Sequence, residues 1–138
     1  MDSQARLEHV AIAVPDLEAA VQVYSTILGR AVAGREHVES EGVRVAFFEL
    51  DGPRLELLEP TGPDTPIGRF LERRGPGLHH IALEVPDIEG AIERCRAAGL
   101  ETVGEAPRTG AGRRKVAFLH PGGTGGVLLE LSQRADEP

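Results

Sequence analysis

An internal repeat is the feature that most constrains this chain. The stretch Leu7–Val21 returns 71 residues later as Leu78–Ile92, and eight of the fifteen aligned positions are identical. Both copies keep a Val-Pro-Asp tripeptide, and His9 of the first copy aligns with His80 of the second. Two copies of this length are too few for a solenoid, so the repeat predicts two equivalent modules within one domain.

The repeat continues to the last strand expected in each module. Val45-Ala46-Phe47 returns at the same offset as Val116-Ala117-Phe118, and Leu55-Glu56-Leu57 returns three residues later than that as Leu129-Glu130-Leu131. Each repeated glutamate stands between two leucines, so strand alternation places the carboxylate on the face opposite to them. Such a carboxylate must be exposed, paired or bound to a cation, because desolvating it alone costs several kcal/mol.

Size and composition exclude several classes of protein. A chain of 138 residues fits one compact domain, and its net charge of −7 argues against nucleic acid or an anionic membrane as the main partner. The apolar runs are far shorter than the roughly 20 residues of a membrane span, and the first residues lack a secretory signal, so we expect a cytoplasmic protein. Cys95 is the single cysteine, which excludes an intramolecular disulfide.

Hydrophobic periodicity predicts the order βαβββ in each module. The strands expected in the first module, residues 6–60, are 7–14, 30–38, 43–50 and 54–59. The strands expected in the second module, residues 78–133, are 78–85, 101–105, 115–120 and 127–131. Asp16 and Asp87 are predicted N-caps of the two module helices, which Gly29 and Gly99 end. Residues 61–77 are predicted to form a helical linker with Thr65 as its N-cap.

The repeated histidines and glutamates form the candidate site. In each module the histidine lies on the first strand and the glutamate on the last, both facing away from the helix. A lone strand histidine or glutamate is usually solvated or hydrogen-bonded, but a pseudo-twofold axis would bring two such pairs to one place. Two imidazoles and two carboxylates suit a first-row divalent ion such as Co²⁺, Mn²⁺, Ni²⁺, Zn²⁺ or Fe²⁺. The four residues are His9, Glu56, His80 and Glu130.

Other polar residues are weaker candidates. Among the remaining histidines, His37 falls in a polar loop, His79 is expected to point toward the helix layer, and His120 is expected near the mouth of the cavity. Two basic clusters, one at Arg69, Arg73 and Arg74 and one at Arg113-Arg114-Lys115, offer contacts to an anionic small molecule, although most such clusters are simply solvated.

Five further motifs carry a family resemblance, which runs from about Leu7 to Gln133. They are Leu57-Leu58-Glu59-Pro60, Pro63-Asp64-Thr65-Pro66-Ile67, Gly77-Leu78-His79-His80-Ile81-Ala82, Phe118-Leu119-His120-Pro121 and Gly126-Val127-Leu128-Leu129-Glu130-Leu131. With the duplicated βαβββ pattern, the chain resembles the vicinal oxygen chelate superfamily, which includes glyoxalase I, extradiol dioxygenases and drug-resistance proteins. Within that superfamily it resembles the methylmalonyl-CoA epimerases.

The resemblance implies a fold and a site. The fold is α+β, with two tandem βαβββ modules forming a cupped mixed sheet around a metal. The implied metal ligands are His9, Glu56, His80 and Glu130, the implied cofactor is a divalent ion with Co²⁺ first, and the implied partners are an acyl-CoA substrate and a second copy of the chain in a homodimer.

The resemblance also implies a reaction. It is the interconversion of (2R)- and (2S)-methylmalonyl-CoA by proton removal at C2 through a metal-stabilised enolate. Inversion needs an acid or base on each face of C2, and the pseudo-twofold makes Glu130 and Glu56 the opposed candidates, with Glu130 favoured. Some members use a glutamate on the third strand as a base. The matching stretch here, Gly42-Val43-Arg44-Val45-Ala46, contains none, so the second base stays open.

Three alternative functions share this fold. A glyoxalase I-type isomerase would use similar ligands on a glutathione hemithioacetal. An extradiol dioxygenase fits less well, since those enzymes need only a His-His-Glu set and have longer chains. A metal-free drug-binding module would lack stoichiometric metal and would tolerate alanine at His9 and His80. The sequence leaves open the native metal and the residues that contact CoA.

Overall fold

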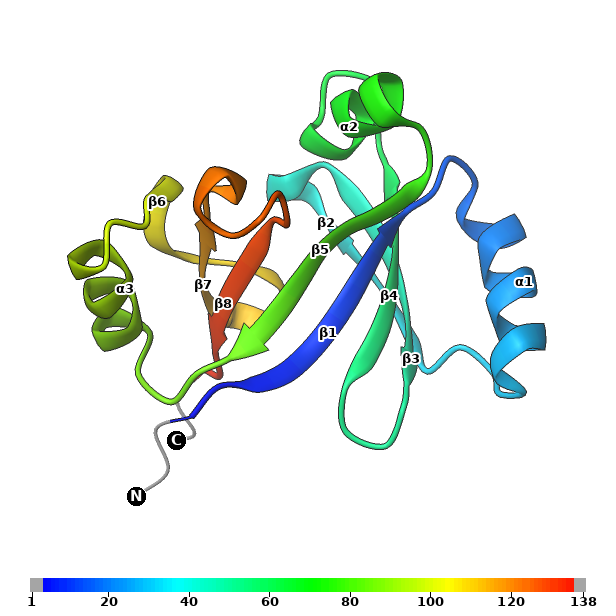
Figure 1. Ribbon diagram of the computed structural model, residues 1–138. Coiled ribbons are helices and arrows are strands. Elements are labelled where there is room, and N and C mark those ends of the chain that lie inside the picture. Colours follow the sequence, from blue (N-terminus) through cyan, green and yellow to red (C-terminus); the bar gives the residue numbers. More distant parts are fainter. Residues whose placement is uncertain (1–3, 136–138) are drawn as a thin grey trace. The chain divides into compact units, whose positions relative to one another are not determined.

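A computed structural model describes residues 4–135 of the chain (Figure 1). The backbone contacts divide these residues into two compact units. One unit contains residues 9–79, and the other contains residues 4–8 together with 80–135. Each unit is described by itself below.

The unit of residues 9–79 holds four strands and two helices. Its elements are β1 (Arg6–Ala13), α1 (Leu17–Leu28), β2 (Gly34–Val38), β3 (Val43–Glu49), β4 (Arg54–Pro60) and α2 (Pro66–Arg74). The strands lie in the order β2-β3-β4-β1, where β1 runs parallel to β4 and the other neighbours are antiparallel. The residues of β1 before His9 are counted with the other unit.

The second unit repeats this plan. Its elements are β5 (Gly77–Glu84), α3 (Ile88–Ala97), β6 (Thr102–Thr109), β7 (Lys115–Leu119) and β8 (Leu129–Gln133). The strand order is β5-β8-β7-β6, with β5 parallel to β8 and the other neighbours antiparallel. The first strand of each module therefore lies beside its last, and the predicted tandem βαβββ fold of the vicinal oxygen chelate type is confirmed.

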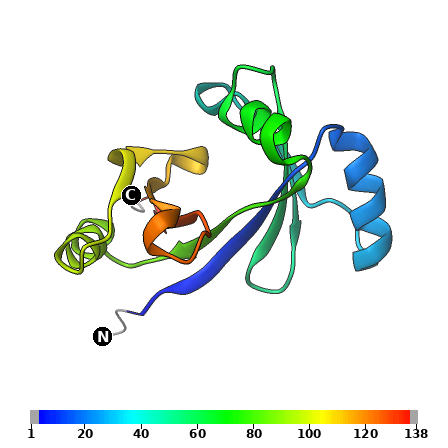
Figure 2. The ribbon, with the colours of Figure 1, turned by 45° about the horizontal axis from the view of Figure 1, so that its top comes forward.

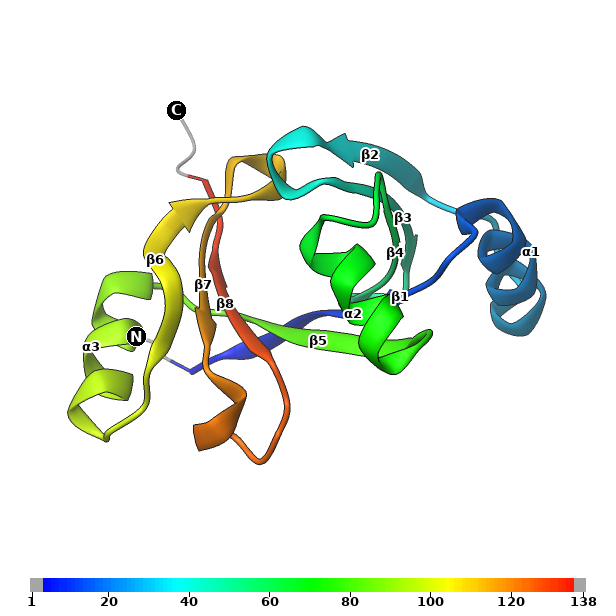
Figure 3. The same cartoon turned by 90° about the horizontal axis from the view of Figure 1, so that it is seen from above.

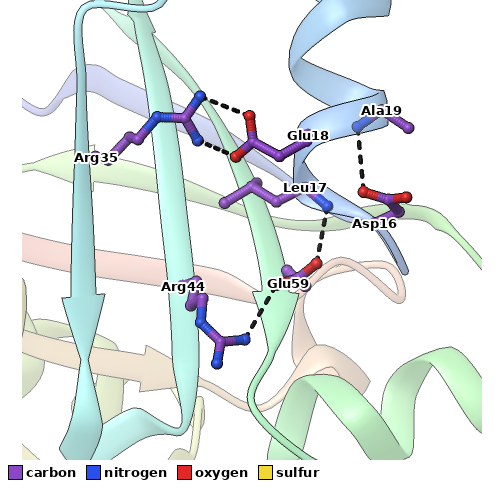
Figure 4. Close-up of polar contacts among 7 residues, drawn as sticks. All are labelled: Asp16, Leu17, Glu18, Ala19, Arg35, Arg44 and Glu59. Carbon is purple, nitrogen blue, oxygen red and sulfur yellow. Dashed lines mark hydrogen bonds and ion pairs between the residues drawn. The ribbon is translucent and has the colours of Figure 1, made fainter.

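The predicted bounds of the first helix are confirmed by its caps. The Asp16 side chain accepts a hydrogen bond from the Ala19 backbone N–H at 3.2 Å, and Gly29 ends the helix in the left-handed conformation at φ 66°. A second acceptor comes from β4, because the Glu59 carboxylate accepts from the Leu17 N–H at 2.9 Å (Figure 4). Side-chain oxygens thus satisfy two of the N–H groups that a helix start leaves unpaired.

The two helices of the first unit cover opposite faces of its sheet (Figures 2 and 3). On one face, α1 packs through Leu17 and Val21 against Phe48 and Leu57. On the other face, α2 packs against the end of the sheet that carries these buried residues: Ala11, Ala13, Val43, Val45 and Leu58. His9, Ala11 and Ala13 are two residues apart along β1, so their side chains share one face of the strand. Helix α2 therefore lies over the face that carries His9.

The core of the second unit lies under α3. Ile88, Ala91 and Ile92 of this helix pack against apolar residues of the strands, and Ile88 is fully buried. Cys95 is half-buried against the same core, as a structural thiol would be. In the described part of the chain, the helices are too short or too polar to span a membrane.

Three strands differ from the sequence-based expectation. β2 begins at Gly34 instead of residue 30. β6 runs over residues 102–109 instead of 101–105, and its pairing with β7 shifts register between Val103 and Arg108. A bulge interrupts the alternation by which a strand is recognised. β8 starts at Leu129 instead of 127, since Gly125 and Gly126 hold positive φ angles of 76° and 88° and turn the chain first.

Candidate functional site

His9 and Glu56 lie side by side in the first unit. The parallel pairing of β1 with β4 sets Ala11 opposite Glu56, so the glutamate faces the same side as His9. The His9 Nδ1 atom is 3.5 Å from Glu56 Oε2, and both residues are buried, with 6% and 9% of their surface exposed. This pair is called the first half-site below.

His80 and Glu130 form the matching pair in the second unit. The parallel pairing of β5 with β8 sets Ala82 opposite Glu130, as Ala11 is set opposite Glu56 in the other unit. The His80 Nε2 atom is 3.1 Å from Glu130 Oε1, and each residue is 7% exposed. This pair is the second half-site.

The donors of both half-sites suit a transition metal. Two ligands bound to one ion at about 2.1 Å lie roughly 3.0 to 3.4 Å apart in octahedral or tetrahedral geometry. The observed separations of 3.1 and 3.5 Å are close to this range. A buried hydrogen-bonded pair would show similar distances, but the same pair at equivalent positions in both modules is more than core packing requires. Each half-site can supply one imidazole and one carboxylate to a divalent cation.

Arg54 belongs to the first half-site, although the sequence analysis did not single it out. Its Nη2 atom is 2.8 Å from Glu56 Oε2. Its guanidinium also lies over the ring of Phe47, 4.8 Å from the centroid, and Phe47 is the neighbour of Glu56 on β3. The signal was present in the sequence, because Arg54 precedes Glu56 by two positions on one strand and so shares its face.

The second half-site also contains a phenylalanine and an arginine. Phe118 of β7 is the neighbour of Glu130, and its ring packs edge-on against His80 with centroids 5.6 Å apart. Arg108 lies over Phe118 at 5.4 Å. The phenylalanines of the two half-sites occupy equivalent repeat positions, whereas the arginines come from different strands. In the first half-site, Arg54 forms an ion pair with Glu56.

The two basic clusters have contacts within the chain. Arg114 donates to Ser132 Oγ at 3.0 Å and lies 3.6 Å from carboxylate oxygens of both Glu8 and Glu84. Arg69 donates to the Asp64 carbonyl at 2.7 Å. These two arginines therefore stabilise the fold locally.

The other three histidines occupy different surroundings. The His79 ring packs edge-on against Phe70 of α2, with centroids 4.9 Å apart. The sequence predicts that His79 points toward the helix layer, and the helix that it contacts is α2, which is counted with the same unit as His79. His120 Nδ1 accepts from the Gly122 N–H at 2.9 Å and caps the turn 121–123. His37 is exposed on β2.

Comparison with known proteins identifies relatives over nearly the whole chain. The family model described as Glyoxalase/Bleomycin resistance protein/Dioxygenase superfamily matches residues 8–118. An ethylmalonyl-CoA/methylmalonyl-CoA epimerase of Cereibacter sphaeroides is 45% identical over 130 residues, which are 93% of this chain and 97% of that protein. The mitochondrial methylmalonyl-CoA epimerase of Homo sapiens is 43% identical over 129 residues, 93% of this chain and 73% of that protein.

A solved structure of a methylmalonyl-CoA epimerase is also similar to this chain. A methylmalonyl-CoA epimerase in complex with methylmalonyl-CoA and NH4⁺ superimposes with a TM-score of 0.90 at 35% identity. The match covers 99% of this chain and 100% of that protein.

Proposed function

The chain belongs to the methylmalonyl-CoA epimerase family of the glyoxalase, bleomycin resistance protein and dioxygenase superfamily, and on that premise we propose that it interconverts (2R)- and (2S)-methylmalonyl-CoA. The observation that carries the proposal is the recurrence of a buried His-Glu pair in both units of a chain that is 45% identical to such an epimerase. Its substrate is an acyl-CoA, and its reaction is proton removal and return at C2.

The proposed metal ligands are His9, Glu56, His80 and Glu130. Imidazole and carboxylate donors together suit first-row divalent ions, among which Co²⁺ is our first expectation. When bound, such an ion would act as a Lewis acid that stabilises the negative charge developing on the substrate oxygens.

Glu130 is the proposed base on one face of C2, and Glu56 is the proposed partner on the other. A base must come within about 3 Å of the proton that it takes. The Arg54 guanidinium, 2.8 Å from Glu56 Oε2, favours the charged carboxylate of Glu56. On β3, Val43 and Val45 share the face of Glu56 and leave it without an acid or base from that part of the strand.

A glyoxalase-type isomerase is the second candidate, because the matching family model includes glyoxalases. It would act on the hemithioacetal of methylglyoxal and glutathione with the same donor set. If the protein turned over this hemithioacetal and did not turn over methylmalonyl-CoA, the glyoxalase-type function would be the correct one. A metal-free drug-binding protein of the same fold would show neither activity.

Quaternary structure and location complete the proposal. We expect a homodimer, as is usual in the family, and a cytoplasmic protein. Sedimentation velocity tests the first expectation through the mass of the particle, which should be twice the 14.7 kDa of the chain. Fractionation of the source cells tests the second.

The deciding experiment follows hydrogen exchange at C2. Metal-free protein and protein loaded with Co²⁺ are each incubated with (2S)-methylmalonyl-CoA in deuterated water, and the product is analysed by mass spectrometry and by chiral assay. We expect deuterium at C2 and formation of the (2R) epimer, with both lost after chelation. If the Co²⁺-loaded protein inverts nothing, the proposed function is wrong.

A further inference from the structure

We propose that Arg54 binds the 2-carboxylate of the acyl-CoA substrate and thereby selects malonyl-type thioesters over thioesters of simple monocarboxylic acids. The inference rests on the proposed function and deepens it, because it assigns a residue to the recognition of the acyl group. It is argued below from the position, orientation and charge of Arg54.

The position of Arg54 is set by the pairing of two strands. In the parallel register of β1 with β4, His9 lies directly opposite Arg54. Residues opposite each other share a face, and Glu56, two positions further along β4, shares it as well. The Arg54 side chain is 24% exposed, against 11% for Glu56, so it lies toward solvent from the proposed ligand. A ligand that enters the site from solvent can therefore reach Arg54.

The orientation of Arg54 is set by two contacts. Nη2 pairs with Glu56 Oε2 at 2.8 Å, and the planar guanidinium lies over the Phe47 ring at 4.8 Å. A guanidinium is a planar fork of N–H donors, and Nη2 is the nitrogen that makes this ion pair. Held in this way, Arg54 has lost much of its rotamer freedom before a ligand arrives, so less entropy is lost when a carboxylate binds. Carboxylates are the groups that this planar fork matches best.

Charge balance also calls for a cation at this place. Two neutral histidines and two carboxylates neutralise one divalent ion, so the proposed metal set has no charge left over for an anionic substrate. The acyl group of a malonyl-type thioester brings one negative charge, and Arg54 supplies one positive charge beside the proposed ligands. Glu49, the neighbour of Arg54 on β3, is exposed, so solvent screens its opposing charge.

Other arginines of the same unit face elsewhere. Arg35 pairs with Glu18 of α1 at 2.5 and 2.9 Å, and Arg44 pairs with Glu59 at 3.1 Å (Figure 4). Their neighbours on the strands show that both lie on the face covered by α1, opposite to His9 and Glu56. Arg35 is therefore a matched control, since it is an ion-paired arginine in the same sheet but on the wrong face.

The test compares two ligands that differ only in a carboxylate. Malonyl-CoA and acetyl-CoA are titrated by calorimetry into the Co²⁺-loaded protein, and the ratio of the two dissociation constants is measured. We expect the wild type to prefer malonyl-CoA and Arg54→Met to lose about 10- to 100-fold of that preference, the range for a charge-assisted hydrogen bond. Arg35→Met should keep the wild-type ratio.

A second variant at Arg54 controls for the possibility that Arg54→Met disrupts the metal site or the fold. Arg54→Gln keeps an N–H donor for Glu56 but removes the charge, and its metal content and melting temperature are measured beside the wild type. We expect it to lose the preference as Arg54→Met does. An unchanged ratio in metal-loaded Arg54→Gln would overturn the inference, and so would loss of the preference in Arg108→Met instead. Wild-type protein that shows no exchange at C2 would count against the proposed function, which these ratios do not measure.

Discussion

At the scale of single residues, the two half-sites have the same kinds of metal donor. Each has a buried histidine within 3.5 Å of a glutamate and a phenylalanine beside that glutamate. Glu56 is also ion-paired with Arg54, whose Nη2 atom is 2.8 Å from Glu56 Oε2. The proposed division, with Glu130 as the favoured base and Glu56 as the partner on the other face, takes this ion pair of Glu56 into account.

Glutamine at the two glutamates tests that division. Glu130→Gln keeps an oxygen that can bind metal but cannot take a proton, so kcat should fall about 10²-fold or more. In Glu56→Gln, exchange of the C2 proton should slow less, because the Glu56 carboxylate is held in an ion pair with Arg54. Both are measured by deuterium incorporation from each epimer in metal-loaded protein. Full epimerisation by Glu130→Gln would place the base elsewhere.

Alanine at His80 tests the proposed metal site. The imidazole pairs with Glu130 and packs against Phe118, away from the core under α3. His80→Ala should therefore lose metal and activity together while its circular dichroism spectrum stays like that of the wild type. His37→Ala, at an exposed histidine, should keep both. Metal content by mass spectrometry is the readout, and full occupancy in His80→Ala would exclude this residue as a ligand.

At the scale of elements, Glu59 connects three parts of the first unit. One carboxylate oxygen accepts from the Leu17 N–H at the start of α1, and the other pairs with Arg44 of β3 (Figure 4). Glu59 itself lies on β4, so a single half-buried side chain joins a helix N-terminus to two strands. A carboxylate at a helix N-terminus also interacts favourably with the helix dipole.

Glu59→Ala should cost about 2 kcal/mol in the free energy of unfolding, because hydrogen bonds to a charged group are worth about 1.5 to 3 kcal/mol. Glu18→Ala removes an exposed ion pair with Arg35 and should cost less than about 1 kcal/mol. Urea denaturation of the two variants gives the comparison. Equal losses would mean that the Leu17 hydrogen bond adds nothing to the stability of the first unit.

The core under α3 permits a second test of packing. Ile88 is fully buried, so Ile88→Ala should destabilise the protein by about 2 to 5 kcal/mol. Ile27 of α1 is 67% exposed, and Ile27→Ala should change stability by less than about 0.5 kcal/mol. Thermal melts of both variants measure the change in stability. A small loss of stability in Ile88→Ala would show that the apolar side of α3 does not hold this helix on the sheet.

The sequence predicted where helices begin and end better than it predicted which elements pack against each other. Asp16, Gly29 and Thr65 mark helix ends through contacts that span a few residues, and the structure confirms them. The sequence predicted a helical linker over residues 61–77, but it did not indicate against which unit the helix packs. The structure places it on the first unit. The contact between Arg54 and Phe47 was equally hidden, since it joins two strands whose register the sequence does not state.

At the scale of the whole molecule, the chain passes from one unit to the other directly before each repeated histidine. Residues 4–8 are counted with the second unit, where Glu8 lies 3.6 Å from Arg114. Residues 77–79 are counted with the first unit, where His79 packs against Phe70. Each first strand is therefore divided between the units, and the pieces exchanged are equivalent in the repeat.

Cutting the chain between the modules should expose this exchange. We expect a fragment of residues 1–76 and a fragment of residues 77–138 to be unstable alone, since each lacks strand residues that complete its unit. Expressed together, the fragments should associate and regain metal binding, as measured by co-purification and metal content. A stable, monomeric 1–76 fragment would show that the exchanged residues are dispensable.

The shared strands also bear on how such a protein arose. A gene that encoded a single module would have produced a chain whose first strand has its opening residues in the unit of another copy. Such a chain would be complete only as a pair of identical copies. Joining two copies of such a gene would free each half to diverge. Arg54 stands two positions before Glu56, whereas Leu128 stands two positions before Glu130, and this is the kind of asymmetry that two identical chains can never acquire.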